Sequence, residues 1–177
     1  MKKFFLIASI LIFSLFGKSK AQTYEATDLY EAQAVYLYSI CKYMQWPTEA
    51  LHGNFIIGVL SNDPIISELK KIASTRKYVS QPIEIKVFNS ISELTKTHVL
   101  FVPNRKTEQI DLIVNKINKN QTLLVSNKKG AISLGAGINF ILSTDGKLKF
   151  EINKGNILNK GIKVNSTIDK LAIKIYS

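Results

Sequence analysis

Few side chains in this sequence are arranged for catalysis. The chain has two histidines, His52 and His98, and they stand far apart in the sequence. It contains no G-x-S-x-G motif, which would mark a serine nucleophile, and no H-E-x-x-H motif, which would mark a zinc site. Its 13 acidic residues are spread along the chain, so no pair of carboxylates is spaced for general acid–base chemistry. The sequence therefore predicts a protein that is not an enzyme and that holds no metal or cofactor.

Cys41 is the only cysteine in the chain, so no intramolecular disulfide can form, even in an oxidising compartment. It falls on the apolar side of a predicted helix, where a free cysteine behaves as a small buried hydrophobe. The alternatives are an intermolecular disulfide across a dimer and a reactive thiol. Among the residues next to Cys41 in the sequence, only Lys42 would lower the pKa of its thiol.

Glycines are concentrated in residues 130–137, directly before an apolar segment. Such a segment can bind an anion or let a peptide approach the backbone closely. A dinucleotide-binding fingerprint needs G-x-G-x-x-G between a strand and a helix, and the apolar hairpin that follows here excludes that motif. A tight turn or bulge before Ile138 is the simpler interpretation. Outward-facing Glu151 and Asn153 are expected to be solvated or to cap a loop. The candidate binding residues of this hairpin are Gly135, Gly137, Asn139 and Phe140.

The element that positions the remaining candidates is a helix expected over residues 28–47. Asp28 fits an N-cap with Glu31 three residues later, and Pro47 ends the helix. The helix is apolar nearly all round, which indicates that it is buried on two sides or contacts a partner. One of its faces carries Tyr30, Ala34, Leu37, Cys41 and Met44.

Two groups on this helix are candidates for a partner surface. Tyr36 and Tyr43 are seven residues apart and so share one side of the helix, where they could form a self-association stripe. Trp46 and Pro47 could anchor a partner, since tryptophan often contributes strongly to interface energy. The alternative for the tyrosines is core packing. For Trp46 it is packing over the sheet edge to fix the helix exit, which we favour.

The N-terminus has the pattern of an export signal. Lys2 and Lys3 precede an apolar run over residues 4–16, and small residues within 19–21 form a cleavage site. The run is too short for a stable membrane span. We expect residues 1–21 to be removed after export and residues 22–177 to form a single domain.

The chain is basic, with a net charge of +11, and removal of the four lysines of the signal leaves +7. Export and the scattered positions of the lysines argue against nucleic acid as a partner. A solvated basic surface is the simplest interpretation, and a weak contact with an anionic membrane surface is the alternative.

The rest of the sequence predicts an α/β domain. Strands are expected at residues 55–60, 82–88, 98–102 and 122–126, and helices at 64–74, 90–94 and 107–119. This alternation is typical of a three-layer domain with a largely parallel sheet and helices on both faces. Asp145 and Gly146 mark the turn of a β-hairpin. Its strands are expected at residues 138–143 and 147–152, followed by closing helices at 154–160 and 166–175.

Several segments, taken in order, resemble the YfiR-like family of exported bacterial proteins. They are AVYLY and KYMQWP of the first helix, FIIGVL followed by Asp63–Pro64, VLFV at 99–102, TLLVS at 122–126, GAGINF at 135–140 and KFEIN at 149–153. None of these segments is specific alone. The ordered set covers nearly the whole mature chain.

The resemblance implies a periplasmic domain that commonly forms a homodimer. It also implies a role in cyclic-di-GMP signalling, in which the protein restrains an inner-membrane diguanylate cyclase by docking on that enzyme's periplasmic sensor region. Members that sense the redox state use paired cysteines, and the single Cys41 departs from that pattern. The spacing Gly135-Ala136-Gly137 also departs from the adjacent glycines of the family.

Two functions from different classes are open at this point. The first is a regulatory binding protein that holds a membrane-anchored signalling enzyme in one state through the first helix and the glycine-rich hairpin. The second is a sensor domain that binds a small molecule at the carboxyl ends of the strands and feeds a histidine kinase or transporter. An exposed aromatic helix face favours the first, and a buried one beside a deep pocket favours the second.

Overall fold

The computed structural model describes residues 26–118 and 120–177. The predicted signal peptide, residues 1–21, lies outside these ranges. Within them, no helix is long and apolar enough to cross a membrane. The α/β fold predicted from the sequence is confirmed.

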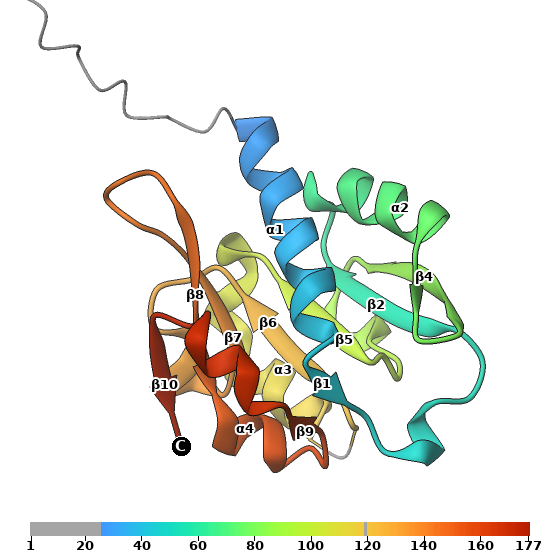
Figure 1. Ribbon diagram of the computed structural model, residues 1–177. Coiled ribbons are helices and arrows are strands. Elements are labelled where there is room, and N and C mark those ends of the chain that lie inside the picture. The colour runs from blue at the N-terminus through green and yellow to red at the C-terminus, as the bar shows by residue number, and fades with distance from the viewer. Residues whose placement is uncertain (1–25, 119) are drawn as a thin grey trace, which may run out of the picture.

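The domain is built on a mostly parallel sheet with the strand order β10-β8-β7-β6-β5-β2-β4-β3 (Figure 1). The strands are β2 (Phe55–Leu60), β3 (Lys77–Tyr78), β4 (Gln81–Phe88), β5 (Val99–Val102), β6 (Leu123–Ser126), β7 (Ile138–Leu142), β8 (Leu148–Asn153) and β10 (Lys174–Tyr176). Strands β4, β2, β5, β6 and β7 run parallel to one another. Strands β7 and β8 form an antiparallel hairpin in which Ile138 lies opposite Ile152. The predicted parallel strands and hairpin are both present.

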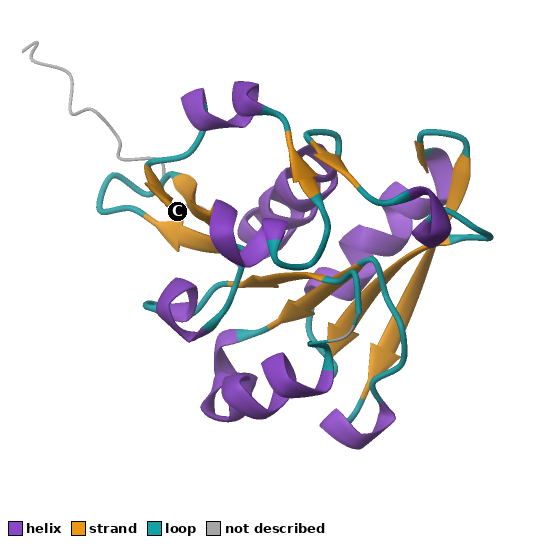
Figure 2. Cartoon of the chain, turned by 90° about the horizontal axis from the view of Figure 1, so that it is seen from below, coloured by secondary structure: helices purple, strands orange, loops and turns teal. Residues whose placement is uncertain are grey.

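The central strands are apolar on both faces because helical layers cover each side of the sheet. On β5, Val99 and Phe101 belong to one hydrophobic cluster, while Leu100 and Val102 belong to a second, and all four are fully buried. The first cluster is covered by α1 (Ala26–Cys41), α2 (Ile65–Thr75) and α4 (Lys154–Leu158), and the second by α3 (Ile110–Lys116). Figure 2 shows helices on both sides of the sheet, which makes the domain three-layered.

Helix α1 differs from its prediction at both ends. Its described part starts at Ala26, so Asp28 lies within the helix instead of capping it. It ends at Cys41, before the predicted end at Pro47. Residues Met44–Gln45 form β1, which pairs antiparallel with β9 (Lys163–Val164). This tertiary pairing, with a segment far along the chain, replaces the last predicted turn of the helix.

The prediction of a helix over residues 166–175 is wrong for its second half. A 3-10 helix covers Ser166–Lys170, and the chain then forms β10, parallel to β8. The backbone N–H of Ile173 donates to the carbonyl oxygen of Phe150 at 2.9 Å, directly before the pairing begins. Ile173 and Ile175 alternate with polar residues, a pattern that suits an edge strand.

Two other predicted helices are shorter than expected. Within residues 107–119, a 3-10 helix over Asn104–Gln109 leads into α3, which ends at Lys116. Within residues 154–160, α4 ends at Leu158. The side chain of Asn153 caps α4 by accepting a hydrogen bond from the N–H of Asn156 at 2.9 Å, so Asn153 has the capping role considered for it.

Candidate functional site

The outer side of α1 is exposed near the middle of the helix. Val35 is 46% exposed and Tyr36 is 38% exposed, whereas their neighbours Ala34 and Leu37 are buried against the sheet. Tyr43, the second predicted tyrosine of this side, is half-buried. Helix α1 is therefore buried on one side and presents an apolar, partly aromatic surface on the other.

Tyr36 contacts the glycine-rich hairpin directly. Its ring lies edge-on to the ring of Phe140 on β7, with centroids 6.5 Å apart and an interplanar angle of 87°. Phe140 is only 2% exposed, so Tyr36 packs against it from the solvent side. The fold thus brings together two candidate residues from segments that are distant in the sequence.

A groove of about 510 Å³ runs between α1 and α2 beside this surface. Val35 and Tyr38 line it from α1, and Lys42 lines it from the turn directly after α1. Lys71 and Arg76 line it from α2 and its end. The ammonium of Lys42 lies 4.5 Å from the centre of the Tyr38 ring, within the range of a cation–π contact. We call Val35, Tyr36, Tyr38 and Lys42 the α1 face. It combines exposed apolar area with positive charge.

Trp46 lies in the core and is 2% exposed. Its ring contacts Phe55, Tyr78 and His98 edge-on, with centroid distances of 5.0, 5.4 and 6.2 Å. Its indole N–H donates to the carbonyl oxygen of Gln121 at 2.9 Å. Trp46 therefore has the packing role that the sequence analysis set against a partner anchor. Pro47, which follows it, is half-buried.

The glycines of the hairpin serve close packing. Gly135 has φ +109°, and a Cβ there would lie 2.8 Å from Val114. A Cβ on Gly137 would lie 2.6 Å from Cγ1 of Ile157 and 2.9 Å from Cδ1 of Leu123. The backbone of Gly137 also makes two hydrogen bonds. Its N–H donates to the carbonyl oxygen of Leu124, and its carbonyl oxygen accepts from the N–H of Asn153. These contacts agree with the interpretation of a tight turn before Ile138.

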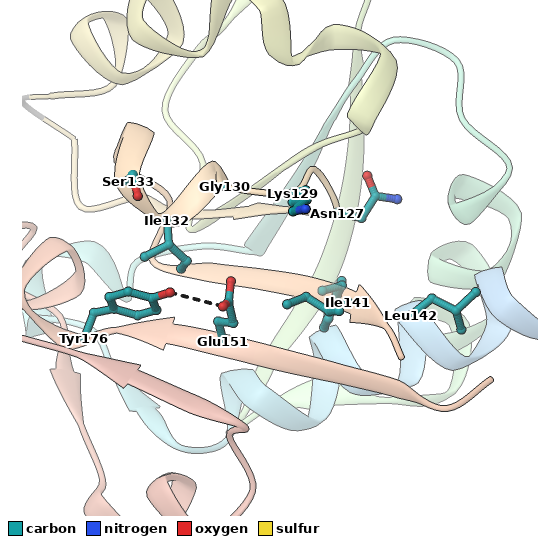
Figure 3. A pocket seen from close by; sticks show the side chains of 10 residues that line it. Asn127, Lys129, Gly130, Ile132, Ser133, Ile141, Leu142, Glu151 and Tyr176 are labelled. Atoms are coloured by element: carbon teal, nitrogen blue, oxygen red, sulfur yellow. Dashed lines mark hydrogen bonds between the residues drawn. The ribbon is translucent and has the colours of Figure 1, made fainter. Parts of the chain in front are cut away.

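A pocket of about 500 Å³ opens on the opposite face of the hairpin (Figure 3). One wall is the segment 127–133, which follows the carboxyl end of β6, and the other is formed by β7, β8 and β10. Ile132, Ile141 and Leu142 make it partly apolar, and Lys129 and Ser133 add polar groups.

Glu151 of β8 is the carboxylate of this pocket. One oxygen accepts a hydrogen bond from the hydroxyl of Tyr176 at 3.1 Å, drawn in Figure 3, and the other accepts from the amide nitrogen of Asn139 at 3.3 Å. Asn139 is fully buried, and its side-chain oxygen has no hydrogen-bond partner among the described residues. The site holds one oriented carboxylate that can accept from a small ligand.

Sequence reasoning expected Glu151 to be solvated or to cap a loop, and it did not name Glu151 as a residue of a ligand pocket. Counting outwards from a three-residue turn over residues 144–146, with Ser143 opposite Lys147, would have paired Asn139 with Glu151, as the structure has them. Nothing in the sequence indicated Tyr176, because β10 was expected to be helical.

Catalytic and metal-binding chemistry finds no further support in residues 26–118 and 120–177, where no group of three or more His, Cys, Asp or Glu side chains could hold a metal ion. His52 is exposed, whereas His98 is buried. Cys41 is 1% exposed, and burial raises the pKa of its thiol to about 12, so the predicted burial is confirmed.

Comparison with known proteins gave a family and a similar solved structure. The family model described as YfiR/HmsC-like matches residues 30–173. A conserved domain protein from Vibrio cholerae O1 biovar El Tor strain N16961 has a similar structure, with a TM-score of 0.57 and 13% sequence identity. The match covers 82% of this chain and 60% of that protein, so the chain spans less than two thirds of its length. No curated protein matches the chain.

Proposed function

Because this chain belongs to the YfiR/HmsC-like family, whose members are periplasmic regulators of signalling rather than catalysts, we propose that it restrains a membrane-anchored signalling enzyme by direct contact. The enzyme we propose is a diguanylate cyclase, as the family resemblance implies. The observation that carries the proposal is the α1 face, where the apolar side chains Val35 and Tyr36 remain exposed on a helix whose opposite side is packed into the core.

The α1 face has the composition of a binding surface. Aromatic and aliphatic side chains that are exposed together supply the apolar centre of an interface, and Arg or Lys at its edge supplies charge complementarity. Here Tyr36 and Val35 provide the apolar area, and Lys42 and Arg76 provide positive charge in the adjoining groove. The contact between Tyr36 and Phe140 adds support, because it ties this surface to the hairpin.

The regulation would operate by differential affinity. A protein that binds the inactive state of an enzyme more tightly than the active state shifts the population towards the inactive one. Any signal that weakens the contact then releases the enzyme. We further propose a homodimer, as the family resemblance implies, and sedimentation velocity on the mature protein would measure it.

The test is capture of the membrane partner. Mature protein is immobilised and incubated with detergent-solubilised membranes of its own host, and retained proteins are identified by mass spectrometry. We expect a membrane cyclase or kinase to be retained by the wild type and by Tyr36→Phe, which keeps the ring. Tyr36→Ala is expected to reduce its retention about tenfold, the equivalent of about 1.4 kcal/mol.

Leu112→Ala is the matched control for this experiment. Leu112 is also an exposed apolar residue, 57% accessible, but it lies on α3, on the opposite side of the sheet. Its substitution should leave retention unchanged. Equal losses for Tyr36→Ala and Leu112→Ala would contradict the proposed surface, and retention of no membrane signalling protein by the wild type would contradict the proposed function.

The second candidate is a small-molecule sensor, and the pocket around Glu151 is the observation that favours it. It lies beside the carboxyl end of β6 and is large enough for a small ligand. A ligand there would feed a histidine kinase or transporter. Thermal-shift screening of polar metabolites against wild type and Glu151→Gln tests this candidate, since stabilisation by a specific ligand should depend on the carboxylate.

A further inference from the structure

His98 is a buried histidine whose two ring nitrogens are both engaged. It is 5% exposed and directly precedes β5. Its Nδ1 accepts a hydrogen bond from the backbone N–H of Ile56 at 2.8 Å. Its Nε2 lies 2.6 Å from the carbonyl oxygen of Ala50, and since a carbonyl can only accept, Nε2 carries the proton. The neutral ring with its proton on Nε2 satisfies both contacts.

These bonds fasten the chain that leaves α1 to the centre of the sheet. Ile56 belongs to β2, and its carbonyl oxygen also accepts from the backbone N–H of His98 at 2.9 Å. Ala50 closes the 3-10 helix Thr48–Ala50, which follows Trp46. The ring of Phe55 is stacked on His98 at 4.6 Å, and Trp46 lies edge-on to it.

A second proton is incompatible with this arrangement. It would go on Nδ1 and direct a donor at the N–H of Ile56, so the bond would be lost and two buried donors would face each other. Burial lowers the pKa of His98 below its ordinary value, the hydrogen bond to Ala50 opposes that shift, and the positive charge of Lys96 adds to it.

Four other titratable groups lie around His98 or next to its partners: Tyr78, Cys41, Lys96 and Glu49. The pKa values of Tyr78 and Cys41 are raised to about 12, chiefly by burial, so both stay neutral. Lys96 contributes a positive charge near the ring. Glu49, next to Ala50 in sequence, is exposed and accepts a hydrogen bond from Gln121. Histidine is the side chain whose ordinary charge change lies nearest to mild acid, so His98 is the group of this cluster that we expect to respond.

We propose that protonation of His98 in mild acid releases the segment from Trp46 to Phe55 from the sheet, and so acts as an acid-sensitive latch. Acid weakens the fold at this position because the folded state favours the neutral form of His98. The contribution of His98 to stability is complete above about pH 6.5 and is lost as the pH falls below it. The regulatory consequence rests on the proposed function, because the released segment continues from the helix that carries the α1 face.

Trp46 makes the latch measurable, because it is the only tryptophan in the chain. Mature protein is titrated from pH 8 to 4.5 while tryptophan emission and far-ultraviolet circular dichroism are recorded. We expect a change in emission with a midpoint below pH 6.5, while the dichroism of the helices is retained. His98→Gln keeps an amide that can donate to Ala50 but cannot titrate in this range, and it should abolish the transition.

His52→Gln is the matched control, since His52 is the only other histidine and is exposed. It should retain the transition. Constant emission in the wild type, or the same transition in His98→Gln, would overturn the proposal. Should His98→Gln fail to fold, nitrogen NMR of the wild-type imidazoles decides independently, because ordinary titration of His98 near pH 6.5, or a proton on Nδ1 at neutral pH, would also overturn it.

The regulatory consequence has a separate readout. Capture of the membrane partner is repeated at pH 7.5 and 5.5, and loss at pH 5.5 is expected for the wild type but not for His98→Gln. Equal capture by the wild type at both pH values would overturn the regulatory part. A protein that captures no partner at either pH but shows the emission transition contradicts the proposed function and leaves the latch supported.

Discussion

The indole N–H of Trp46 donates to the backbone carbonyl of Gln121 at 2.9 Å, which joins the segment that follows β1 to the loop before β6. Gln121 in turn donates through its side chain to Glu49, three residues after Trp46. Two hydrogen bonds with Gln121 thereby hold the segment that follows α1 against the loop before β6. This explains why Trp46 is buried rather than available to a partner.

Trp46→Ala should destabilise the fold by about 3–5 kcal/mol, because it removes a large buried ring and leaves a cavity. Trp46→Phe should cost less, about 1–3 kcal/mol, since most of the apolar contact remains and one hydrogen bond is lost. Urea denaturation followed by circular dichroism measures both. A loss below 1 kcal/mol for Trp46→Ala would show that the ring is not part of the core.

Tyr36→Ala should have a much smaller effect on stability, about 1 kcal/mol. Its ring is partly exposed, and the main loss is the edge-on contact with Phe140. Tyr36→Phe should be close to neutral in the same urea experiment. A Tyr36→Ala protein as unstable as Trp46→Ala would mean that Tyr36 supports the core, and its effect on partner capture could not then be assigned to the surface.

Cys41 should be inert in the folded protein. With the pKa of its thiol raised to about 12, roughly one thiol in ten thousand is ionised at pH 8, and the side chain is buried as well. Ellman's reagent at pH 8 should therefore react with it only after urea is added. A disulfide-linked dimer on a non-reducing gel of native protein would contradict this expectation.

Gly137→Ala should destabilise the fold by about 1–3 kcal/mol through overpacking against Ile157 and Leu123. Combining it with Ile157→Ala should give less than the sum of the two single effects, because the clashing atoms of Ile157 are removed while the contact with Leu123 remains. Gly130→Ala is the control. There φ is +83° with nothing within 4 Å of the added methyl, so its cost of about 1 kcal/mol should not depend on Ile157.

Glu151→Ala should cost about 1–3 kcal/mol, because it leaves the buried amide of Asn139 without an acceptor. Glu151→Gln retains an acceptor oxygen and should cost less. Tyr176→Phe removes only the hydrogen bond from the Tyr176 hydroxyl to the carboxylate. It should therefore destabilise the fold less than Glu151→Ala does. Thermal unfolding of the three variants measures this order, and identical midpoints would show that the carboxylate is fully solvated.

Local patterns in the sequence were sufficient for most of the sheet. The buried strand at 99–102 is apolar at every position because helices cover both of its faces, and Asp145–Gly146 provides the conformation that a hairpin turn requires. The apolar surface of the first helix likewise indicated that it has more than one contact. These features follow from hydrophobic periodicity and turn chemistry, which act over a few residues.

The tertiary structure decided which of those contacts lie inside the domain. Met44–Gln45 leaves the helix because it pairs with β9, and the C-terminal segment becomes β10 because an open edge of β8 accepts it. Burial of Trp46, exposure of Tyr36 and the bonds that hold Glu151 likewise depend on residues distant in sequence. Such pairings are set by free energy gained across the whole fold, which no local pattern in a single sequence encodes.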